Sequence, residues 1–388
     1  MTTPHLAVIG GGQLARMMAQ AAMGLGVRIR LLAEGPDVSA AQVVTDHIVG
    51  DYTDLDTLRR VVVDAPVVTF DHEHVPPDHL AVLQSEGHDC RPGPHALLFA
   101  QDKGEMRIRL GELGIPCPRN AAIDSVADLD GFAALVGGYP VVLKTTRGGY
   151  DGKGVWIVGS ATDAAEAFAA GRQLIAEEKV DFVRELSALV ARSPQGETRA
   201  YPVVESFQLD GVCKEVIAPA PALAESLDRA ARDIAATIAE SLDVTGILAV
   251  ELFETRDGRI LVNELAMRPH NTGHWTIDGA HTSQFENHLR AVLDLPLGST
   301  AARAPWTVMV NILGGTVGDL EAQVAVVLAA EPDVKVHLYG KAVKAGRKVG
   351  HVTAYGDDLA VVQSCARRAA QLFENGYGET GQPGVEES

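Results

Sequence analysis

Apolar and polar positions alternate between strand-like and helix-like spacing through the first part of the chain. The run LAVIG at 6–10 predicts a buried strand, and apolar side chains recur at helical spacing over 13–23. The same alternation continues with a strand, a helix and another strand, at 27–32, 54–63 and 67–70. Strands separated by helices build an open, mainly parallel sheet, so we expect an α/β domain over residues 1–100.

A glycine-rich turn separates two apolar runs, 141–143 and 155–158, which together predict a hairpin. Four of the seven positions 148–154 of this turn are glycine, namely Gly148, Gly149, Gly152 and Gly154. Such a turn permits positive φ and brings backbone N–H groups close to a ligand, where they can hold phosphate oxygens. Lys144, at the end of the first run, adds a positive charge for the same phosphates. The alternative is a structural hairpin with a flexible tip.

A second hairpin is predicted by the apolar runs 247–253 and 260–263, on either side of an Arg-Asp-Gly turn. Its strands carry Glu251 and Glu264, which antiparallel pairing would bring near each other on one face. These carboxylates and the amide of Asn263 are hard oxygen ligands of the kind that Mg²⁺ prefers. The alternative is a pair of solvated acids. Glu251 argues against it, because this residue interrupts an apolar strand, where an unpaired charge is costly.

The rest of the pattern divides the chain. Two short helices are expected within 92–119, and Gly114, Pro116 and Pro118 then mark a boundary. An Ala-rich helix is expected over 161–176. The fold class is therefore α/β, and α+β in the later domains. We expect an N-terminal domain, a helical connection, a small domain with the glycine turn, a larger mixed domain and a disordered tail, at 1–100, 101–119, 120–205, 206–375 and 376–388.

Composition places the chain among globular proteins, with 46% apolar and 22% charged residues. No apolar run approaches about 18 residues, and the start, MTTPHLAVIGGG, lacks a basic segment, so neither a membrane span nor a signal peptide is expected. The net charge of −18 argues against a nucleic-acid partner. Four cysteines lie far apart without a CxxC pair, which indicates reduced thiols in the cytoplasm rather than a zinc or disulfide framework.

The loop LAMRPHNTGHW, which follows the second hairpin, concentrates polar chemistry. Arg268 suits bidentate binding of a small oxyanion. His270 and His274 have the spacing of a helical zinc pair, but the proline and glycine within the loop disfavour a regular helix. Glu73, in a DHEH segment just after a predicted strand end, is expected to contact a ligand, and a metal site in that segment is the weaker alternative.

Positive charge gathers near the C-terminal end. Four cations fall within eight residues, namely Lys341, Lys344, Arg347 and Lys348. In an acidic chain this local reversal of sign indicates a phosphate site, and a basic turn at the surface is the alternative.

The N-terminal glycines favour a different function. Gly10-x-Gly12-x-x-Ala15, with Glu34 about twenty residues further on, matches the dinucleotide-binding fingerprint. An NAD-dependent oxidoreductase is therefore one alternative, although it leaves the glycine turn and the glutamate pair without a role. A non-catalytic nucleotide-binding or scaffold protein is another. It is disfavoured because the carboxylates and the lysines are all present.

Several segments together resemble the N5-carboxyaminoimidazole ribonucleotide synthases, the ATP-grasp carboxylases of bacterial and fungal purine synthesis. They are the glycine turn, Glu251 with Glu264, the RPHNTGHW loop, the closing YGKAVKAGRKVGH and the opening VIGGGQLARMM. The resemblance extends to about residue 365. It implies an ATP-grasp fold preceded by an open parallel-sheet (pre-ATP-grasp) domain. ATP would lie between the small middle domain and the last domain.

The resemblance also implies the site residues. ATP would be bound by Lys103, Lys144, Gly149, Tyr150, Asp151, Gly152, Lys153, Gly154, Val155, Glu177, Glu178, Lys179, Val180, Glu185, Gln208, Asn263 and Glu264. The metal ligands would be Glu251 and Glu264. The ribonucleotide would be bound by Glu73, Tyr150, Asp151, Arg268, His270, Lys341, Arg347 and Lys348, and the catalytic residues would be Glu73, Asp151, Arg268 and His270. Two features depart from the family pattern. Gln208 stands where the family often has histidine, and AEEKVDF is more polar than usual.

The implied reaction is the ATP-dependent carboxylation of 5-aminoimidazole ribonucleotide by bicarbonate through carboxyphosphate, with Mg²⁺ or Mn²⁺, in a cytoplasmic homodimer. Arg268 would hold bicarbonate, and Asp151 would accept the proton of the attacking amine. The glycine turn would close to exclude water, which hydrolyses carboxyphosphate. Among ligases, a formate-using transformylase or a carrier-linked carboxylase is the nearest alternative.

Overall fold

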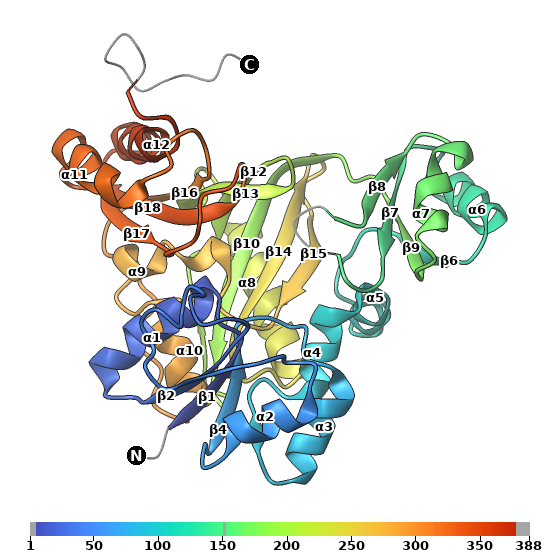
Figure 1. Cartoon of the computed structure of the whole chain (residues 1–388). Coiled ribbons are helices and arrows are strands. Elements are labelled where there is room, and N and C mark those ends of the chain that lie inside the picture. The colour runs from blue at the N-terminus through green and yellow to red at the C-terminus, as the bar shows by residue number, and fades with distance from the viewer. Residues whose placement is uncertain (1–4, 150–152, 378–388) are drawn as a thin grey trace.

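Three sheets organise the residues that the computed structural model describes, 5–149 and 153–377 (Figure 1). The first, here called the N-terminal sheet, is parallel and has the order β3-β2-β1-β4-β5. Its strands are β1 (Leu6–Ile9), β2 (Ile29–Ala33), β3 (His47–Val49), β4 (Val67–Phe70) and β5 (Asp89–Cys90), and its helices are α1 (Gln13–Leu25), α2 (Leu55–Val62) and α3 (Pro77–Ser85). All residues of β1 and β4 are buried, which accounts for their unbroken apolar runs. The expected parallel α/β unit is confirmed.

Two helices, α4 (Pro94–Gln101) and α5 (Lys103–Glu112), lead away from the N-terminal sheet, as predicted. Asp102 ends the first helix and caps the second. Its carboxylate accepts hydrogen bonds from the N–H groups of Gly104 and Glu105, at 2.9 and 3.2 Å. The cap fixes the start of α5, so the side chain of Lys103 leaves the helix from a defined point.

The second sheet, here called the small sheet, has the order β6-β9-β7-β8 and stands apart in green in Figure 1. Its strands are β6 (Asn120–Ile123), β7 (Val141–Thr145), β8 (Val155–Val158) and β9 (Leu174–Glu178), and its helices are α6 (Val126–Val136) and α7 (Ala165–Ala169). β7 and β8 pair antiparallel, with Lys144 opposite Val155. The hairpin around the glycine turn is therefore confirmed.

The helix predicted over 161–176 is wrong in its C-terminal half. A 3₁₀ turn, η1 (Ala161–Ala164), leads into α7, which ends at Ala169. Gly171 then adopts a φ of 62°, which ends the helix. Residues 174–178 form β9 instead, because this apolar segment fills the place between β6 and β7.

The third sheet, here called the large sheet, is antiparallel and has the order β15-β14-β10-β12-β13-β16-β18-β17, with β11 beside β10. Its strands are β10 (Phe182–Arg192), β11 (Thr198–Ala200), β12 (Val204–Leu209), β13 (Val212–Ala218), β14 (Gly246–Thr255), β15 (Ile260–Ala266), β16 (Trp306–Leu313), β17 (Lys335–Leu338) and β18 (Lys348–Gly356). Its helices are α8 (Glu225–Ser241), η2 (Asn271–Gly273), α9 (Thr276–Gly279), α10 (Gln284–Val292), α11 (Leu320–Ala330) and α12 (Leu359–Asn375). The chain changes sheets between Glu178 and Phe182, ahead of the boundary expected at 205, because β10 pairs with β14 along its length.

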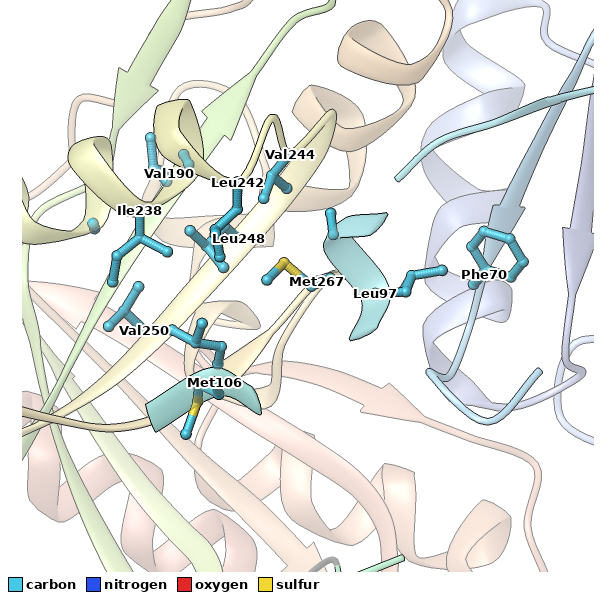
Figure 2. Close-up of a cluster of buried hydrophobic side chains, with 14 of the residues drawn as sticks. Phe70, Leu97, Met106, Val190, Ile238, Leu242, Val244, Leu248, Val250 and Met267 are labelled. Carbon is cyan, nitrogen blue, oxygen red and sulfur yellow. The ribbon is translucent and has the colours of Figure 1, made fainter. Parts of the chain in front are cut away.

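The core crosses from one sheet to the next. One buried cluster joins Phe70 of the N-terminal sheet to Leu97 of α4, Met106 of α5, Leu248 of β14 and Met267 just after β15 (Figure 2). A second cluster joins α1 to α10. Helices α4, α5 and α10 therefore hold the N-terminal sheet against the large sheet. None of the helices in the described residues is long and apolar enough to cross a membrane.

Candidate active site

A bulge in β15 shapes the face that carries the predicted metal carboxylates. Glu251 lies directly opposite Glu264, but the next pair is Leu252 with Val262. Asn263 is therefore the extra residue of a β-bulge, which re-aims its side chain. The predicted pairing of Glu251 and Glu264 is confirmed, and the bulge brings the Asn263 amide beside the charged groups described next.

Glu251 occupies an electrostatically unfavourable position. Burial, and then the charges of Glu264 and Glu185, raise the pKa of Glu251 to about 8. A divalent cation beside Glu251 would offset the part of this shift that the two neighbouring carboxylates cause, so the donors present fit Mg²⁺. The described residues contain no cluster of three or more His, Cys, Asp or Glu side chains arranged to hold a metal.

Both lysines that were predicted for nucleotide phosphates reach this face. Lys103, from the start of α5, places Nζ 2.6 Å from Oε1 of Glu264. Lys144, from β7, places Nζ 3.2 Å from Oδ1 of Asn263 and 2.8 Å from Oε2 of Glu177. Helix α5, the small sheet and the large sheet therefore meet at β15.

Arg107 of α5, which sequence reasoning missed, links α5 to β9 and β15 where these elements meet. The buried guanidinium lies 2.7 Å from Oε1 of Glu177 and donates to the carbonyl oxygens of Val262 and Asn263, at 3.0 and 2.7 Å. Burial alone would raise the pKa of Glu177, but the charges of Arg107 and Lys144 outweigh it and lower that pKa to about 2. Two cations share one carboxylate, so a net positive charge remains beside the bulge. An arginine within an apolar helical pattern was the available signal.

Glu73 holds Arg268. Nε of Arg268 donates to Oε2 of Glu73 at 2.7 Å, and the N–H of Met267 donates to Oε1 at 3.2 Å. The DHEH segment therefore contributes a carboxylate that orients the arginine, and the described residues show no metal cluster there. The pairing brings two predicted substrate residues together from the N-terminal sheet and from the loop after β15.

His270 is neutral and has a defined tautomer. Burial, with the charges of Arg268 and Lys348, lowers the pKa of His270 to about 3. The N–H of Thr272, which can only donate, points to Nδ1 at 3.4 Å, and the Thr272 hydroxyl lies 2.9 Å from the same nitrogen. The ring proton therefore sits on Nε2, which faces Oε1 of Glu251 at 3.6 Å. The Ser187 hydroxyl of β10 lies 2.8 Å from the Thr272 hydroxyl and extends this series of hydrogen bonds.

His274 takes no part with His270 in a metal pair. Its ring is fully buried and lies tilted by 40° against that of His351, with 5.2 Å between the ring centroids. Its Nδ1 lies 3.1 Å from the Gln284 amide nitrogen. The irregular loop expected from its proline and glycine is confirmed, since only a short 3₁₀ turn interrupts it.

The C-terminal basic segment divides into two parts. Lys341 bonds to Oε1 of Gln13, at the start of α1. Lys348, half-buried at the start of β18, lies close enough to lower the pKa values of Glu251 and His270. Arg347 is exposed and donates to the carbonyl oxygen of Ala342 at 3.3 Å. Lys348 therefore lies near the centre of the site, whereas Lys341 contacts the helix that follows β1.

The base of the glycine turn is tied to α5. The N–H of Lys103 donates to the Thr146 carbonyl at 2.8 Å, and Arg147 pairs with Asp102 at 2.7 Å. Gly154 has a φ of 70°, as expected for such a turn. The predicted residues Tyr150, Asp151 and Gly152 lie outside the described residues. Of the other predicted turn residues, Gly149 is half-buried, and Lys153 and Val155 are exposed.

The predicted adenine strand is only partly β9. Glu178 ends it and pairs with Arg119 at 2.8 Å, whereas Lys179 and Val180 follow it without secondary structure. The predicted ribose contact, Glu185 of β10, has its pKa raised by burial. Gln208 of β12 is exposed and lies next to a bulge in the neighbouring strand β13.

The dinucleotide fingerprint is internally occupied. The N–H of Gly11 donates to Glu34 at 3.1 Å, and the N–H of Gly12 donates to Asp71. Carboxylates therefore stand where a pyrophosphate would need these donors, which argues against the NAD-dependent alternative.

The fold and the site together define the class. A small sheet with a glycine hairpin lies beside a large antiparallel sheet, and Lys103 of α5 and Lys144 of β7 meet the Asn263-Glu264 pair of β15. This is the arrangement of an ATP-grasp enzyme. The model of the ATP-grasp domain matches residues 108–285, that of the ribonucleotide synthetase preATP-grasp domain matches 1–101, and that of the phosphoribosylaminoimidazole carboxylase C-terminal domain matches 307–364. The N5-carboxyaminoimidazole ribonucleotide synthase of Mycobacterium tuberculosis is 52% identical over 380 residues, which are 96% of this chain and 88% of that protein. The chain belongs to the N5-carboxyaminoimidazole ribonucleotide synthase family.

Two solved structures from Aspergillus clavatus agree with this. One, a carboxyaminoimidazole ribonucleotide synthase complexed with ATP, is 32% identical with a TM-score of 0.88, over 96% of this chain and 99% of that chain. The other, in complex with ADP and 5-aminoimidazole ribonucleotide, is 31% identical with a TM-score of 0.86, over the same shares of both chains. The expected ATP-grasp fold with a preATP-grasp domain is confirmed.

Proposed function

We propose that this chain carboxylates 5-aminoimidazole ribonucleotide with bicarbonate at the expense of ATP, giving N5-carboxyaminoimidazole ribonucleotide for purine synthesis. Membership of the family supports the reaction. The observation that carries it is the meeting of Lys103, Lys144 and Glu264 at the β15 bulge, next to Glu251 and His270. Phosphate-binding cations and metal-type carboxylates thus adjoin a second set of polar residues that suits an anionic substrate.

ATP phosphates would be bound by Lys103, Lys144 and the backbone of the turn from Gly149 to Val155. Transfer of a phosphoryl group to bicarbonate spreads negative charge, which these cations stabilise. The Arg107–Glu177 pair keeps Lys144 in place. The remaining proposed nucleotide contacts are Glu178, Lys179, Val180, Glu185, Gln208 and Asn263.

Glu251 and Glu264, with the Asn263 amide, would hold Mg²⁺ or Mn²⁺, which when bound supplies positive charge to the ATP phosphates. Burial, and then the charges of Glu264 and Glu185, raise the pKa of Glu251, and a carboxylate placed beside two others favours a bound cation, which supports this role.

The second substrate set is Glu73, Arg268, His270, Lys341, Arg347 and Lys348, with Tyr150 and Asp151 from the glycine turn. Arg268, oriented by Glu73, would hold bicarbonate as a bidentate partner. The Lys341–Lys348 segment would bind the ribonucleotide phosphate. Asp151 would take the proton from the attacking amine once carboxyphosphate has formed.

We propose further that the chain acts as a homodimer in the cytoplasm, as the family resemblance implies. The domain division would follow the sheets, with an N-terminal domain at 1–100, a connection at 101–119, a small domain from 120 to Glu178 and a large domain from Phe182 onward. Light scattering after size-exclusion chromatography tests the dimer, for which twice the monomer mass is expected.

The decisive experiment is ADP release with bicarbonate, measured with and without 5-aminoimidazole ribonucleotide. We expect strong stimulation by the ribonucleotide and one carboxylated product for each ADP. Release that ignores the ribonucleotide, or that responds to formate instead, would overturn the proposal in favour of another ligase.

A further inference from the structure

Gln284, the first residue of α10, grips the main chain of His270 at two points. Its Oε1 accepts from the His270 N–H at 2.9 Å, and its Nε2 donates to the His270 carbonyl at 2.7 Å. The side chain is fully buried. Holding both polar groups of one residue fixes the main chain on each side of its Cα, and so the origin of its side chain.

The amide has no alternative orientation. Its second N–H meets Nδ1 of His274 at 3.1 Å, and the strongly lowered pKa of that buried ring keeps it neutral and able to accept. If the Gln284 amide were flipped, Nε2 would face the His270 N–H and Oε1 would face the His270 carbonyl. All three bonding positions are therefore used in one sense only.

The grip is anchored in a rigid element. Ser283 caps α10 by accepting from the N–H of Glu286 at 3.1 Å, and the next apolar residues, Phe285 and Leu289, pack in the core shared with α1. On the loop side, a Cβ on Gly273 would lie 2.3 Å from Oε1 of Gln284, so glycine leaves room for the amide. The loop itself has only a short 3₁₀ turn to order it.

The His270 ring, in contrast, contacts Thr272 and Glu251 rather than Gln284. We propose that Gln284 is a positioning residue, which sets the His270 imidazole for the aminoimidazole ribonucleotide by clamping the His270 main chain to α10. This role rests on the proposed function. A shift of a reacting contact by about 1 Å costs about a hundredfold in rate, so loosening the clamp should be visible in the kinetics.

The chain offers a matched control on the same helix. Asn287, also fully buried, holds the main chain of Gly298 in the same manner, with its Oδ1 accepting at 2.8 Å and its Nδ2 donating at 3.3 Å. Gly298 belongs to none of the contacts of the proposed site. Gln284→Glu and Asn287→Asp each replace a clamping amide by a carboxylate, and Gln284→Met removes the hydrogen bonds without adding charge.

The test is steady-state ADP release by the full chain with bicarbonate, ATP and the ribonucleotide, together with thermal melting of each variant. We expect Gln284→Met to lower kcat/KM for the ribonucleotide by about 10- to 100-fold, with the KM for ATP within about threefold of wild type. Gln284→Glu should lose more, because its carboxylate would face the His270 carbonyl oxygen. Asn287→Asp should melt earlier but keep kcat/KM within about threefold.

A folded Gln284→Met with wild-type kcat/KM would overturn the positioning role, and so would an equal kinetic loss in Asn287→Asp. Should Gln284→Glu fail to fold, Gln284→Met decides. Wild-type protein that shows no ribonucleotide-dependent ADP release would instead overturn the proposed function, and this role with it.

Discussion

At the scale of single residues, the ion pairs of the site leave some charged groups able to bind a ligand. Glu177 neutralises one of its two cations, leaving Lys144 positively charged in effect. Glu264 is paired with Lys103, whereas burial and then two neighbouring carboxylates raise the pKa of Glu251 to about 8. The same site therefore offers positive charge for phosphate and negative charge for a metal ion.

Glu264→Gln tests the metal pair. The change removes one negative charge beside Glu251 and the partner of Lys103, so we expect turnover to fall by about a hundredfold or more while the fold persists. ADP release and circular dichroism measure the two quantities. Asp257→Asn, at the exposed turn of the same hairpin, is the control and should retain turnover. Activity of Glu264→Gln within a few-fold of wild type would remove it from the metal site.

Glu177→Gln tests the buried triad through pH. The pKa of Glu177 is lowered on folding from 4.5 to about 2, so its charge stabilises the fold above pH 4.5, and this contribution is lost as the pH falls toward 2. We expect the variant to lose about 3 kcal/mol of unfolding free energy at pH 7, a difference from wild type that shrinks below pH 4.5. Urea denaturation of the variant and the wild type, at pH 7 and at a pH below 4.5, measures this difference in unfolding free energy.

The neighbour Glu178 provides the control, because it pairs with Arg119, which is 54% exposed. Glu178→Gln should cost no more than about 1 kcal/mol. Equal losses in the two variants would mean that burial of the triad adds nothing.

At the scale of elements, local irregularities bring the site together. The bulge in β15 turns Asn263 toward Lys144. Asp102 both caps α5 directly before Lys103 and pairs with Arg147 of the glycine turn. The glycine turn is thereby attached to α5 at its base. Backbone conformation at one position of such an element should affect the whole turn.

A pair of glycine substitutions tests this. Gly154→Ala forces a side chain onto a φ of 70° and puts its Cβ 2.6 Å from the Thr145 hydroxyl, so we expect a loss of about 1–2 kcal/mol and a higher KM for ATP. Gly111→Ala, in α5 with open space around it, should gain up to about 1 kcal/mol and leave the KM unchanged. Thermal melting and ATP titration decide. Unchanged stability and an unchanged KM for ATP in Gly154→Ala would contradict the prediction that alanine strains the turn at this position.

At the scale of the whole molecule, the two proposed groups of substrate contacts come from different parts of the chain. The proposed nucleotide contacts lie on α5, the small sheet and β15, whereas the proposed ribonucleotide contacts lie beside the N-terminal sheet, in the loop after β15 and at the start of β18. Core contacts through α4, α5 and α10 hold these parts in one arrangement.

Lys348→Met tests this division. Lys348 is half-buried near Glu251 and His270, so its loss should raise the KM for the ribonucleotide by about 10- to 100-fold and leave the KM for ATP unchanged. Arg347→Ala should have a smaller effect, below about tenfold, since Arg347 is exposed. Lys335→Met, exposed on β17, is the control. A changed KM for ATP in Lys348→Met would mean that Lys348 belongs to the nucleotide site, which would contradict the proposed division.

The sequence by itself determined the features that depend on neighbouring residues. Apolar periodicity located the N-terminal strands and helices, glycine density located the hairpin turn, and a turn signal between two apolar runs placed Glu251 opposite Glu264. Each of these follows from local sterics or from the period of a strand or helix. The resemblance of the motifs to one family then supplied the chemistry.

Only the tertiary structure decided what depends on distant partners. The segment 174–178 reads as helix locally but becomes a strand, because a place between β6 and β7 buries it. Arg107 beside Glu177, and Gln284 around His270, are pairings across 70 and 14 residues that no spacing announces. Hydrogen bonds and ion pairs of this kind form when the packed core brings their elements together, so their geometry exists only in the folded chain.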